Sequence, residues 1–216
     1  MSRLSRPRVL VADDHRMVAE GLKSLLSDHF ELLGIVEDGR ALIEAAKKLK
    51  PDVIVADITM PQLNGIDALG PLKKDNPQVK VVLLTMHQEA AYARRALEAG
   101  ASGYVLKHSA PAELLTAIRA ALDGKTYLTP ALAGQVIQAL REGKDGAEEQ
   151  TGHLTPRQRE ILQLLAEGRS AKEIAGTLGI SSRTVEFHKY QMMESLHLRS
   201  SAELIHYAIK QGIVAI

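Results

Sequence analysis

Residues 52–67 read DVIVADITMPQLNGID, a short apolar run that ends in an acid and leads through a loop into a helix. The run Val53 to Asp57 is too continuously apolar for a strand with one wet face, so we expect a strand buried on both faces. Gly65 allows the close turn before the helix and belongs to no glycine-rich phosphate-binding fingerprint. A buried strand followed by a helix is typical of a parallel sheet covered by helices.

The same alternation extends over about the first 125 residues. The expected strands are Arg8 to Ala12, Leu32 to Glu37, Val53 to Asp57, Val79 to Thr85 and Gly103 to Leu106. The helical patterns that follow them are Arg16 to Ser27, Gly39 to Leu49, Gly65 to Asp75, Gln88 to Ala99 and Pro111 to Asp123. A fivefold repeat of strand then helix predicts an α/β fold with a doubly wound, five-stranded parallel sheet.

The rest of the chain is different. After one more expected helix, Pro130 to Leu140, the stretch Arg141 to Gly152 is poor in apolar residues and rich in Gly and acid, as linkers are. From Leu154 onward only helical signals remain. In a capping box, the side chains of the N-cap residue and of the residue three positions later each bond to the other residue's backbone N–H. We expect such boxes at Thr155 with Gln158, Ser170 with Glu173 and Ser200 with Glu203. Ser181 or Ser182 can cap the other helix.

Length and composition narrow the classes of protein. A chain of 216 residues suits two modest domains, and we expect one over 1–128, a helix and linker over 129–152, and a small four-helix domain over 153–216. Hydrophobic residues are 45% and charged residues 25%, which disfavours disorder. Because there is no Cys, no signal-peptide pattern and no apolar run of roughly 18 residues, we expect a cytoplasmic protein without disulfides, thiolate zinc sites or a membrane partner.

Polar side chains stand at the carboxyl ends of the expected strands, where ligands bind in open α/β sheets. Asp13 and Asp14 follow the first strand, Asp57 ends the third, Thr85 ends the fourth and Lys107 follows the fifth. Clustered carboxylates repel one another unless a hard divalent cation binds, and oxygen ligands suit magnesium. Lys107 and Thr85 can then hold phosphoryl oxygens while Asp57 attacks phosphorus. Each residue taken singly is also an ordinary cap or loop group.

These residues resemble the receiver domain of two-component response regulators over about residues 7–125. The matching motifs are VLVADDH at Val9 to His15, DVIVADITMPQLNGID at Asp52 to Asp67, VVLLT ending at Thr85 and GASGYVLK ending at Lys107. The resemblance implies that Asp57 accepts a phosphoryl group from a sensor histidine kinase. It implies a Mg²⁺ site made of Asp13, Asp14, Asp57 and the Thr59 carbonyl. It also implies residues that couple phosphorylation to conformation, namely Thr85, Tyr104 and Lys107.

Four positions bear further on that resemblance. Tyr104 stands where the switch aromatic belongs, and the alternative is a half-buried tyrosine whose hydroxyl stays wet. His108 follows Lys107 where many receivers have Pro, so that peptide need not be cis. Thr59 and His87 flank the phosphorylation site where family members differ, and we expect them to tune the lifetime of the aspartyl phosphate.

A helix-turn-helix pattern lies near the end of the chain, from Glu173 to Leu196, with Gly179 at the turn. Gly179 can take the left-handed conformation that ends the first helix. On the second helix one stripe is apolar and faces inward: Val185, Met192 and Leu196. The opposite stripe holds Arg183, Glu186, Phe187 and Tyr190. A small helical bundle without a DNA role has the same pattern.

Residues Leu154 to Val214 look like the LuxR-type DNA-binding domain, through LTPRQREILQLLAEGRSAKEIAGTLGIS, the Thr184 and Val185 pair, His188 and the closing AELIHYAIKQGIV. A receiver followed by this domain is the arrangement of the NarL/FixJ subfamily. The resemblance implies double-stranded DNA as a partner, with contacts from Arg183, Thr184, Glu186, Phe187, His188, Lys189 and Tyr190. It also implies a homodimer on activation, and we expect Leu204 and Ala208 of the last helix to face outward and form the dimer contact.

Two departures fall where DNA would be read. Family members often have Lys after the Thr-Val pair and before the Leu that ends the helix, where this chain has Glu186 and Ser195. Fewer cations imply weaker nonspecific affinity and a shallower salt dependence. Glu186 could accept from a cytosine amino group and Phe187 could touch a thymine methyl. Alternatively, Glu186 complements the dipole at the helix N-terminus.

The sequence therefore favours a DNA-binding transcription regulator that is controlled by phosphorylation and is no enzyme beyond its own aspartyl phosphorylation and dephosphorylation. In one hypothesis the unphosphorylated receiver occludes the recognition helix. An aspartyl-phosphate phosphatase would need a second acid two residues after Asp57, where Thr59 stands. The other alternative is a receiver that docks partners while the end domain binds DNA weakly or independently of phosphorylation.

Overall fold

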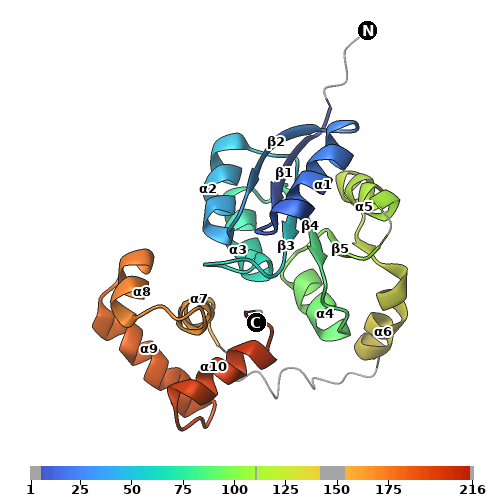
Figure 1. The fold of residues 1–216 in the computed structure, drawn as a ribbon. Helices are drawn as coiled ribbons and strands as arrows, with labels where there is room; N and C mark the ends of the chain where they lie inside the picture. The colour runs from blue at the N-terminus through green and yellow to red at the C-terminus, as the bar shows by residue number, and fades with distance from the viewer. Residues whose placement is uncertain (1–5, 110, 142–153, 215–216) are drawn as a thin grey trace. The chain divides into compact units, whose positions relative to one another are not determined.

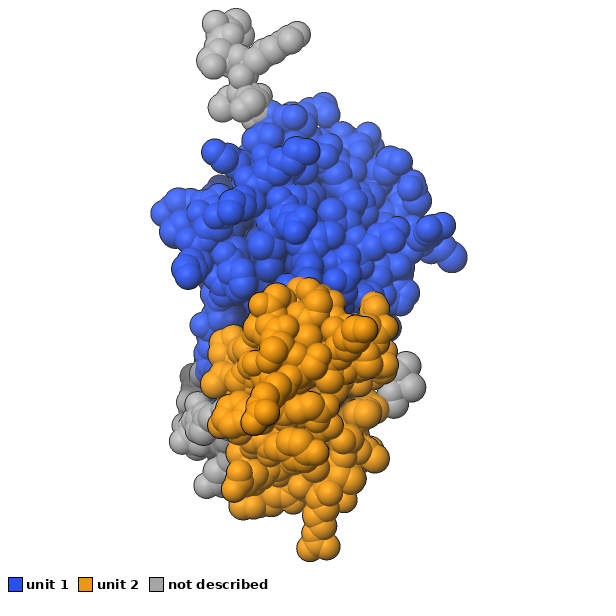
Figure 2. Space-filling view, turned by 90° about the vertical axis from the view of Figure 1, so that its left-hand side faces the viewer, with its two compact units in different colours: residues 1–143 blue, residues 144–216 orange. Residues whose placement is uncertain are grey.

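The computed structural model describes residues 6–109, 111–141 and 154–214 (Figure 1). The chain divides into two compact units, residues 1–143 and 144–216 (Figure 2). The helix expected after residue 129 lies in the first unit. Most of the expected linker falls outside the described residues. The domain limits at 128 and 153 stay predictions. Among the described residues, no helix has the length and apolar character that a bilayer crossing requires.

The first unit is built on a parallel sheet with the strand order β2-β1-β3-β4-β5-β6. The strands are β1 (Arg8–Ala12), β2 (Glu31–Val36), β3 (Val53–Asp57), β4 (Lys80–Thr85), β5 (Gly103–Leu106) and β6 (Tyr127–Leu128). The helices are α1 (Arg16–Ser27), α2 (Gly39–Leu49), α3 (Gly65–Asp75), α4 (Ala90–Glu98), α5 (Pro111–Leu122) and α6 (Pro130–Arg141). Helices α1 and α5 cover one face of the sheet, and α2, α3 and α4 cover the other (Figure 1). The doubly wound α/β fold is confirmed.

Both faces of the central strands are buried, which explains their continuous apolar sequences. On β1, Leu10 packs into the core beneath α2 and α3, whereas Val9 and Val11 pack beneath α1 and α5. Strand β3 repeats the alternation, with Ile54 on the first side and Val55 on the second. The sheet therefore holds the carboxyl ends of its strands between two hydrophobic layers.

The expectation of five strands was wrong by one. Strand β6 pairs in parallel with β5, with Tyr127 opposite Gly103 and Leu128 opposite Tyr104. A two-residue strand is too short to show a period of its own, so its pairing depends on the edge that β5 offers. The next residue, the buried Thr129, extends the contact: its N–H donates to the Tyr104 carbonyl at 3.0 Å, and its hydroxyl accepts from the Leu106 N–H at 3.2 Å.

Helix α6 continues from this edge and packs against α4, with Leu132 and Val136 buried in the core of the first unit. Helix α4 itself is shorter than the expected Gln88 to Ala99. It begins after Glu89, whose extended backbone conformation is that of an N-cap. The residues from Met86 to Gln88 form the loop between β4 and α4.

The second unit contains four helices in its described part: α7 (Pro156–Ala166), α8 (Ala171–Leu178), α9 (Ser182–Ser195) and α10 (Ser201–Lys210). Capping boxes begin α7 at Thr155 and α8 at Ser170, as predicted, and Ser181 caps α9. The box expected at Ser200 is only half formed. The Ser200 hydroxyl accepts from the Glu203 N–H, but the Glu203 carboxylate accepts from the Arg199 N–H at 2.8 Å instead.

Gly65 starts α3 where the backbone of β3 passes very close. A Cβ added at this glycine would stand 2.2 Å from the Asp57 carbonyl oxygen, so the turn requires the absence of a side chain. We expect Gly65→Ala to lower the free energy of unfolding by about 1 to 3 kcal/mol, the usual cost of overpacking, in urea titrations of both proteins.

The matched control is Gly21→Ala, which makes the same substitution on the exposed side of α1. No atom lies within 4 Å of a Cβ added there. Because alanine loses less backbone entropy in a helix, this variant is expected to gain about 0.5 to 1 kcal/mol. If both substitutions changed the free energy of unfolding by the same amount and in the same direction, the packing argument would be contradicted.

Candidate functional site

The carboxyl ends of β1, β3 and β5 bring three charged side chains into contact. Lys107, which follows β5, places its Nζ 2.6 Å from Oδ2 of Asp57 and 2.9 Å from Oδ2 of Asp13. Asp13 and Asp57 are almost fully buried, at 1% and 4% exposed. The Thr59 N–H donates to the other Asp57 oxygen at 3.3 Å. The sheet edge predicted from the sequence therefore forms one compact cluster with a single ammonium between two carboxylates.

A third carboxylate and an imidazole complete the cluster. His15 Nδ1 lies 2.9 Å from Oδ1 of Asp14 and 3.4 Å from Oδ1 of Asp13. One potential ligand atom from each of Asp13, Asp14, His15 and Asp57 can be chosen so that all lie within 4.8 Å of one another. His15 was not predicted as a site residue, although it directly follows the acid pair in VLVADDH.

The donor set fits a hard divalent cation. Asp13 Oδ2 and Asp14 Oδ1 are buried and accept no hydrogen bond of good geometry from the described chain, although Lys107 and His15 lie at ion-pair distance. Carboxylate oxygens with unfilled lone pairs are the ligands that Mg²⁺ prefers, so Asp13, Asp14 and Asp57 suit this ion. The Thr59 carbonyl as a fourth ligand stays a prediction.

Burial sets the protonation of this cluster. It raises the pKa of Asp57 above the ordinary 3.8, and the charge of Asp13 raises it further, while the hydrogen bond and charge of Lys107 lower it. Burial lowers the pKa of Lys107, but its contacts with Asp57 and Asp13 outweigh burial and leave that pKa raised. Lys107 therefore stays charged at neutral pH.

The loop after β4 contacts the loop after Asp57 through His87. The backbone N–H of His87 donates to the Thr85 hydroxyl at 3.1 Å, and its ring Nε2 lies 3.1 Å from the Thr59 hydroxyl. The ring stacks on Tyr92, with centroids 4.5 Å apart. The two residues expected to tune the phosphoryl lifetime, Thr59 and His87, are thus in direct contact, and their effect on lifetime stays a prediction.

Tyr104 is fully buried, so the alternative of a half-buried tyrosine with a wet hydroxyl was wrong. The hydroxyl donates to the His87 backbone carbonyl at 2.9 Å, beneath the loop that follows Thr85. Burial raises the pKa of Tyr104 far above its usual range. The inward ring joins β5 to the loop after β4, and its role as a switch stays a prediction.

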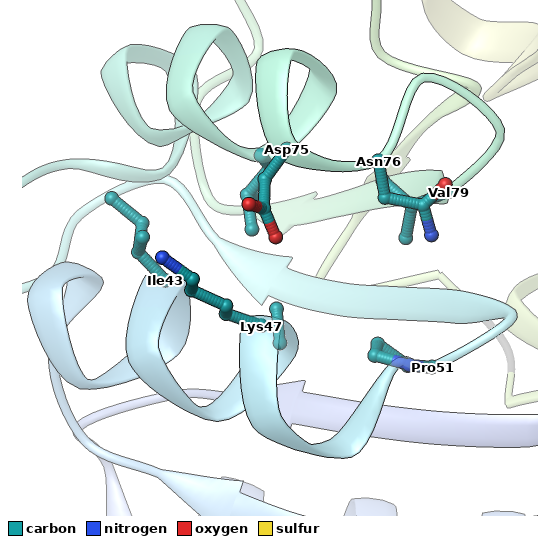
Figure 3. Close-up of a pocket in the computed structure, with 8 residues that line it drawn as sticks. Ile43, Lys47, Pro51, Asp75, Asn76 and Val79 are labelled. Carbon is teal, nitrogen blue, oxygen red and sulfur yellow. The ribbon is translucent and has the colours of Figure 1, made fainter.

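The opposite edge of the sheet offers no comparable chemistry among the described residues. A hollow of about 10 Å³ lies there between α2 and the end of α3, lined by Ile43, Ala46, Lys47, Pro51, Leu72, Asp75, Asn76 and Val79 (Figure 3). This volume suffices for about one water molecule. We assign function to the carboxylate cluster because the charged side chains at the carboxyl ends of β1, β3 and β5 meet there.

The second unit has the predicted helix-turn-helix. Gly179 ends α8 with a φ of 64°, in the left-handed region. Val185 and Met192 are buried, as expected, and Leu196 is half-buried. The opposite stripe of α9 is wet: Arg183 is exposed, Phe187 is 58% exposed and Tyr190 is 62% exposed. In a chain with two Phe and no Trp, two solvent-facing aromatic rings on one helix favour a binding surface.

Some of the residues expected to contact DNA are less exposed and interact with neighbouring side chains or with the helix backbone. Lys189 is held by an ion pair of 2.7 Å with Glu186, and its ammonium lies 5.3 Å from the centroid of the Tyr190 ring. His188 is half-buried and meets the Phe187 ring edge-on at 5.8 Å. Thr184 helps to cap α9 through its N–H, which donates to the Ser181 hydroxyl at 3.1 Å. The DNA-contact roles of these residues stay predictions.

Leu204 and Ala208 do not face outward, so that expectation was wrong. They are 1% and 0% exposed and belong to the core that α10 shares with α7 and α9. A spacing of four residues shows that two side chains lie on the same stripe of a helix, but not whether that stripe faces the core or the solvent. In this small unit the stripe packs into the core. A dimer contact through these two side chains is therefore excluded for the described fold.

Two family models match this chain. The response regulator receiver domain matches residues 9–119, and the LuxR family of bacterial regulatory proteins matches residues 152–208. The chain therefore belongs to the response regulators in which a receiver domain precedes a LuxR-type DNA-binding domain.

Similar proteins match this chain over nearly the whole of both sequences. Transcriptional regulatory protein MctR of Rhizobium johnstonii is 39% identical, over 100% of this chain and 99% of its own. Oxygen regulatory protein NreC of Staphylococcus carnosus is 32% identical, over 96% and 99%. A solved structure of RcsB from Salmonella enterica serovar Typhimurium, bound to the promoter P1flhDC in the presence of the phosphomimetic BeF3-, is 29% identical with a TM-score of 0.59, over 94% of this chain and 98% of that one.

The raised pKa of Asp57 predicts a pH-dependent gain from Asp57→Asn. A folded-state pKa above the unfolded value of about 3.8 means that the wild type loses stability as the pH rises from there through the raised pKa. Asparagine carries no such charge. In chelator-treated protein, we therefore expect the unfolding free energy of the variant minus that of the wild type to grow over this pH range and then level off.

The measurement is a series of urea titrations at increasing pH. Asp123→Asn, on an exposed residue at the end of α5, controls for the loss of a carboxylate as such. A difference that shrinks as the pH rises would show that Lys107, rather than burial, dominates the ionisation of Asp57.

Proposed function

We propose that this protein is a cytoplasmic transcription regulator that accepts a phosphoryl group on Asp57 from a sensor histidine kinase, and that phosphorylation changes its dimerisation and its binding to double-stranded DNA. The observation that carries the proposal is the contact of Lys107 Nζ with both Asp57 and Asp13 at the carboxyl edge of the sheet. This arrangement unites a carboxylate nucleophile with a cation for the oxygens of its electrophile.

Transfer is a substitution at phosphorus. One Asp57 oxygen forms the new bond, while the bond from phosphorus to the imidazole nitrogen of the donor breaks and its electron pair stays on that nitrogen. Lys107 moves its ammonium from Asp57 Oδ2 to a phosphoryl oxygen, and Asp13 keeps it in place from the other side. When Mg²⁺ is bound by Asp13, Asp14, Asp57 and the Thr59 carbonyl, it supplies further positive charge for the phosphoryl oxygens.

A continuous set of contacts supports coupling within the first unit. A Thr85 hydroxyl drawn toward a phosphoryl oxygen would pull on the His87 N–H that donates to it. The His87 carbonyl accepts from Tyr104, and Tyr104 lies on β5, whose backbone is bonded to Thr129. Thr129 immediately precedes α6. We propose that phosphorylation biases α6 through these contacts.

The DNA-binding part of the proposal rests on α9. Its exposed stripe carries Arg183 beside two aromatic rings, a composition suited to phosphate and base-edge contacts. The RcsB structure is bound to promoter DNA in the presence of a phosphomimetic. We propose the same pair of ligand classes, a duplex and a phosphoryl group, for this chain.

The first test combines Mg²⁺ and a small-molecule phosphodonor with intact mass and oligomeric state. We expect one phosphoryl adduct and a dimer with the wild type, and neither with Asp57→Asn. An adduct that persists in the variant would place the acceptor elsewhere. An adduct that leaves both the oligomeric state and the affinity for DNA unchanged would favour the alternative of a receiver that docks partners independently of DNA.

Arg183 provides a test of the DNA surface. Binding to duplex DNA releases about 0.9 counterion for each phosphate contact, so Arg183→Gln is expected to reduce the slope of log affinity against log salt by about one. The effect should be uniform across sequences, because a phosphate contact reads no base. Fluorescence anisotropy between low and high salt measures it.

The control for Arg183 is Lys210→Gln, which removes an exposed cation from the end of α10. It is expected to keep the wild-type slope. Equal slopes for all three proteins would exclude Arg183 as a phosphate contact.

A further inference from the structure

The exposed stripe of α9 contains an acid at its centre, where a DNA-reading surface is expected to carry cations. Glu186 lies one turn after Arg183 and one turn before Tyr190. We propose that the Glu186 carboxylate is a specificity-determining group that accepts a hydrogen bond from the amino group of a cytosine in the major groove. This inference rests on the proposed function, because it requires α9 to enter that groove.

The ion pair on α9 presents the acid rather than the base. Glu186 Oε2 lies 2.7 Å from Lys189 Nζ, and the side chains are 40% and 17% exposed, respectively. Lys189 also lies over the Tyr190 ring. A ligand that approaches this face therefore has better access to the Glu186 side chain than to the Lys189 side chain.

Lys189 makes an acid tolerable near DNA. An isolated carboxylate would be repelled by the phosphates, but a cation 2.7 Å away cancels most of its field at longer range. At hydrogen-bond distance the carboxylate still accepts, because its accepting lone pairs are not used up by one contact. The ion pair therefore repels the DNA phosphates only weakly, while the carboxylate still accepts a hydrogen bond from a donor on a base edge.

The dipole of α9 does not account for Glu186. The helix begins at Ser182, its first turn contains no acid, and Glu186 lies in the second turn. The favourable effect of a negative charge at a helix N-terminus falls off within the first turn. This weighs against the purely helix-stabilising role that the sequence left open.

The chemistry of base edges then selects one base. A carboxylate only accepts hydrogen bonds. In the major groove, guanine shows two acceptors, thymine shows one acceptor, and adenine shows an acceptor beside its donor. Cytosine shows an amino donor and no acceptor of its own. Glu186 is therefore matched to cytosine and mismatched to the other three bases.

The test is selection from a pool of randomised DNA duplexes with the full-length wild type and with Glu186→Gln, both treated with Mg²⁺ and the small-molecule phosphodonor. We expect the wild type to enrich a motif with a cytosine at one position. The preference for cytosine there should fall by about tenfold or more in the variant. Because glutamine pairs with the donor and acceptor of adenine together, the variant should prefer adenine at that position. Release of Lys189 alone would raise affinity for all sequences equally and leave the motif unchanged.

Glu194→Gln is the matched control, because it makes the same substitution at an exposed acid near the end of α9. It should select the wild-type motif. If the wild type enriches a motif and Glu186→Gln enriches the same one, the inference is overturned while the proposed function stands. If the wild type enriches no sequence, the proposed function of DNA reading fails, and the inference fails with it.

Discussion

The contact of one lysine with two buried carboxylates is the constraint on which the rest of the first unit depends. Asp13 and Asp57 lie between two hydrophobic layers, where an unpaired charge is costly, and Lys107 offsets both. Removing the lysine from such a group would cost about 3 to 5 kcal/mol, because the two carboxylates would stay buried without their cation. The cluster is still short of positive charge, since Asp14 joins it with a buried oxygen that lacks a good hydrogen bond. A site built in this way favours the entry of a further cation.

Much of this site follows from the sequence, because parallel strands bring their carboxyl ends to one edge. Apolar runs that end in Asp57 or are followed by Asp13 and Lys107 were enough to place these three side chains together, with Thr85 at the end of the neighbouring strand. The same logic located α9, where a period of 3.6 separates buried Val185 from the wet stripe. These predictions succeeded because each depends on local periodicity and on one general rule of topology.

Other features depend on tertiary partners, which no local pattern encodes. Strand β6 exists because β5 offers an unpaired edge, and the role of Thr129 follows from that pairing. The inward position of Leu204 and Ala208 is decided by the demand of the core, since periodicity defines a stripe without saying which neighbour covers it. The ion pair of Glu186 with Lys189 has a common helical spacing, but the difference in exposure between its partners is visible only in the structure.

The distribution of tyrosines has an optical consequence. The chain has five Tyr and no Trp, so its near-ultraviolet absorption and intrinsic emission come almost entirely from phenol rings. Tyr104 is sealed beneath the loop after β4 and hydrogen-bonded to a backbone carbonyl, whereas Tyr190 stands in water beside Lys189. Soluble quenchers and tyrosine-modifying reagents therefore reach Tyr190 and are kept from Tyr104. The protein thus carries one tyrosine buried beneath the loop after β4 and another on the exposed stripe of α9, and the two differ in their access to solvent.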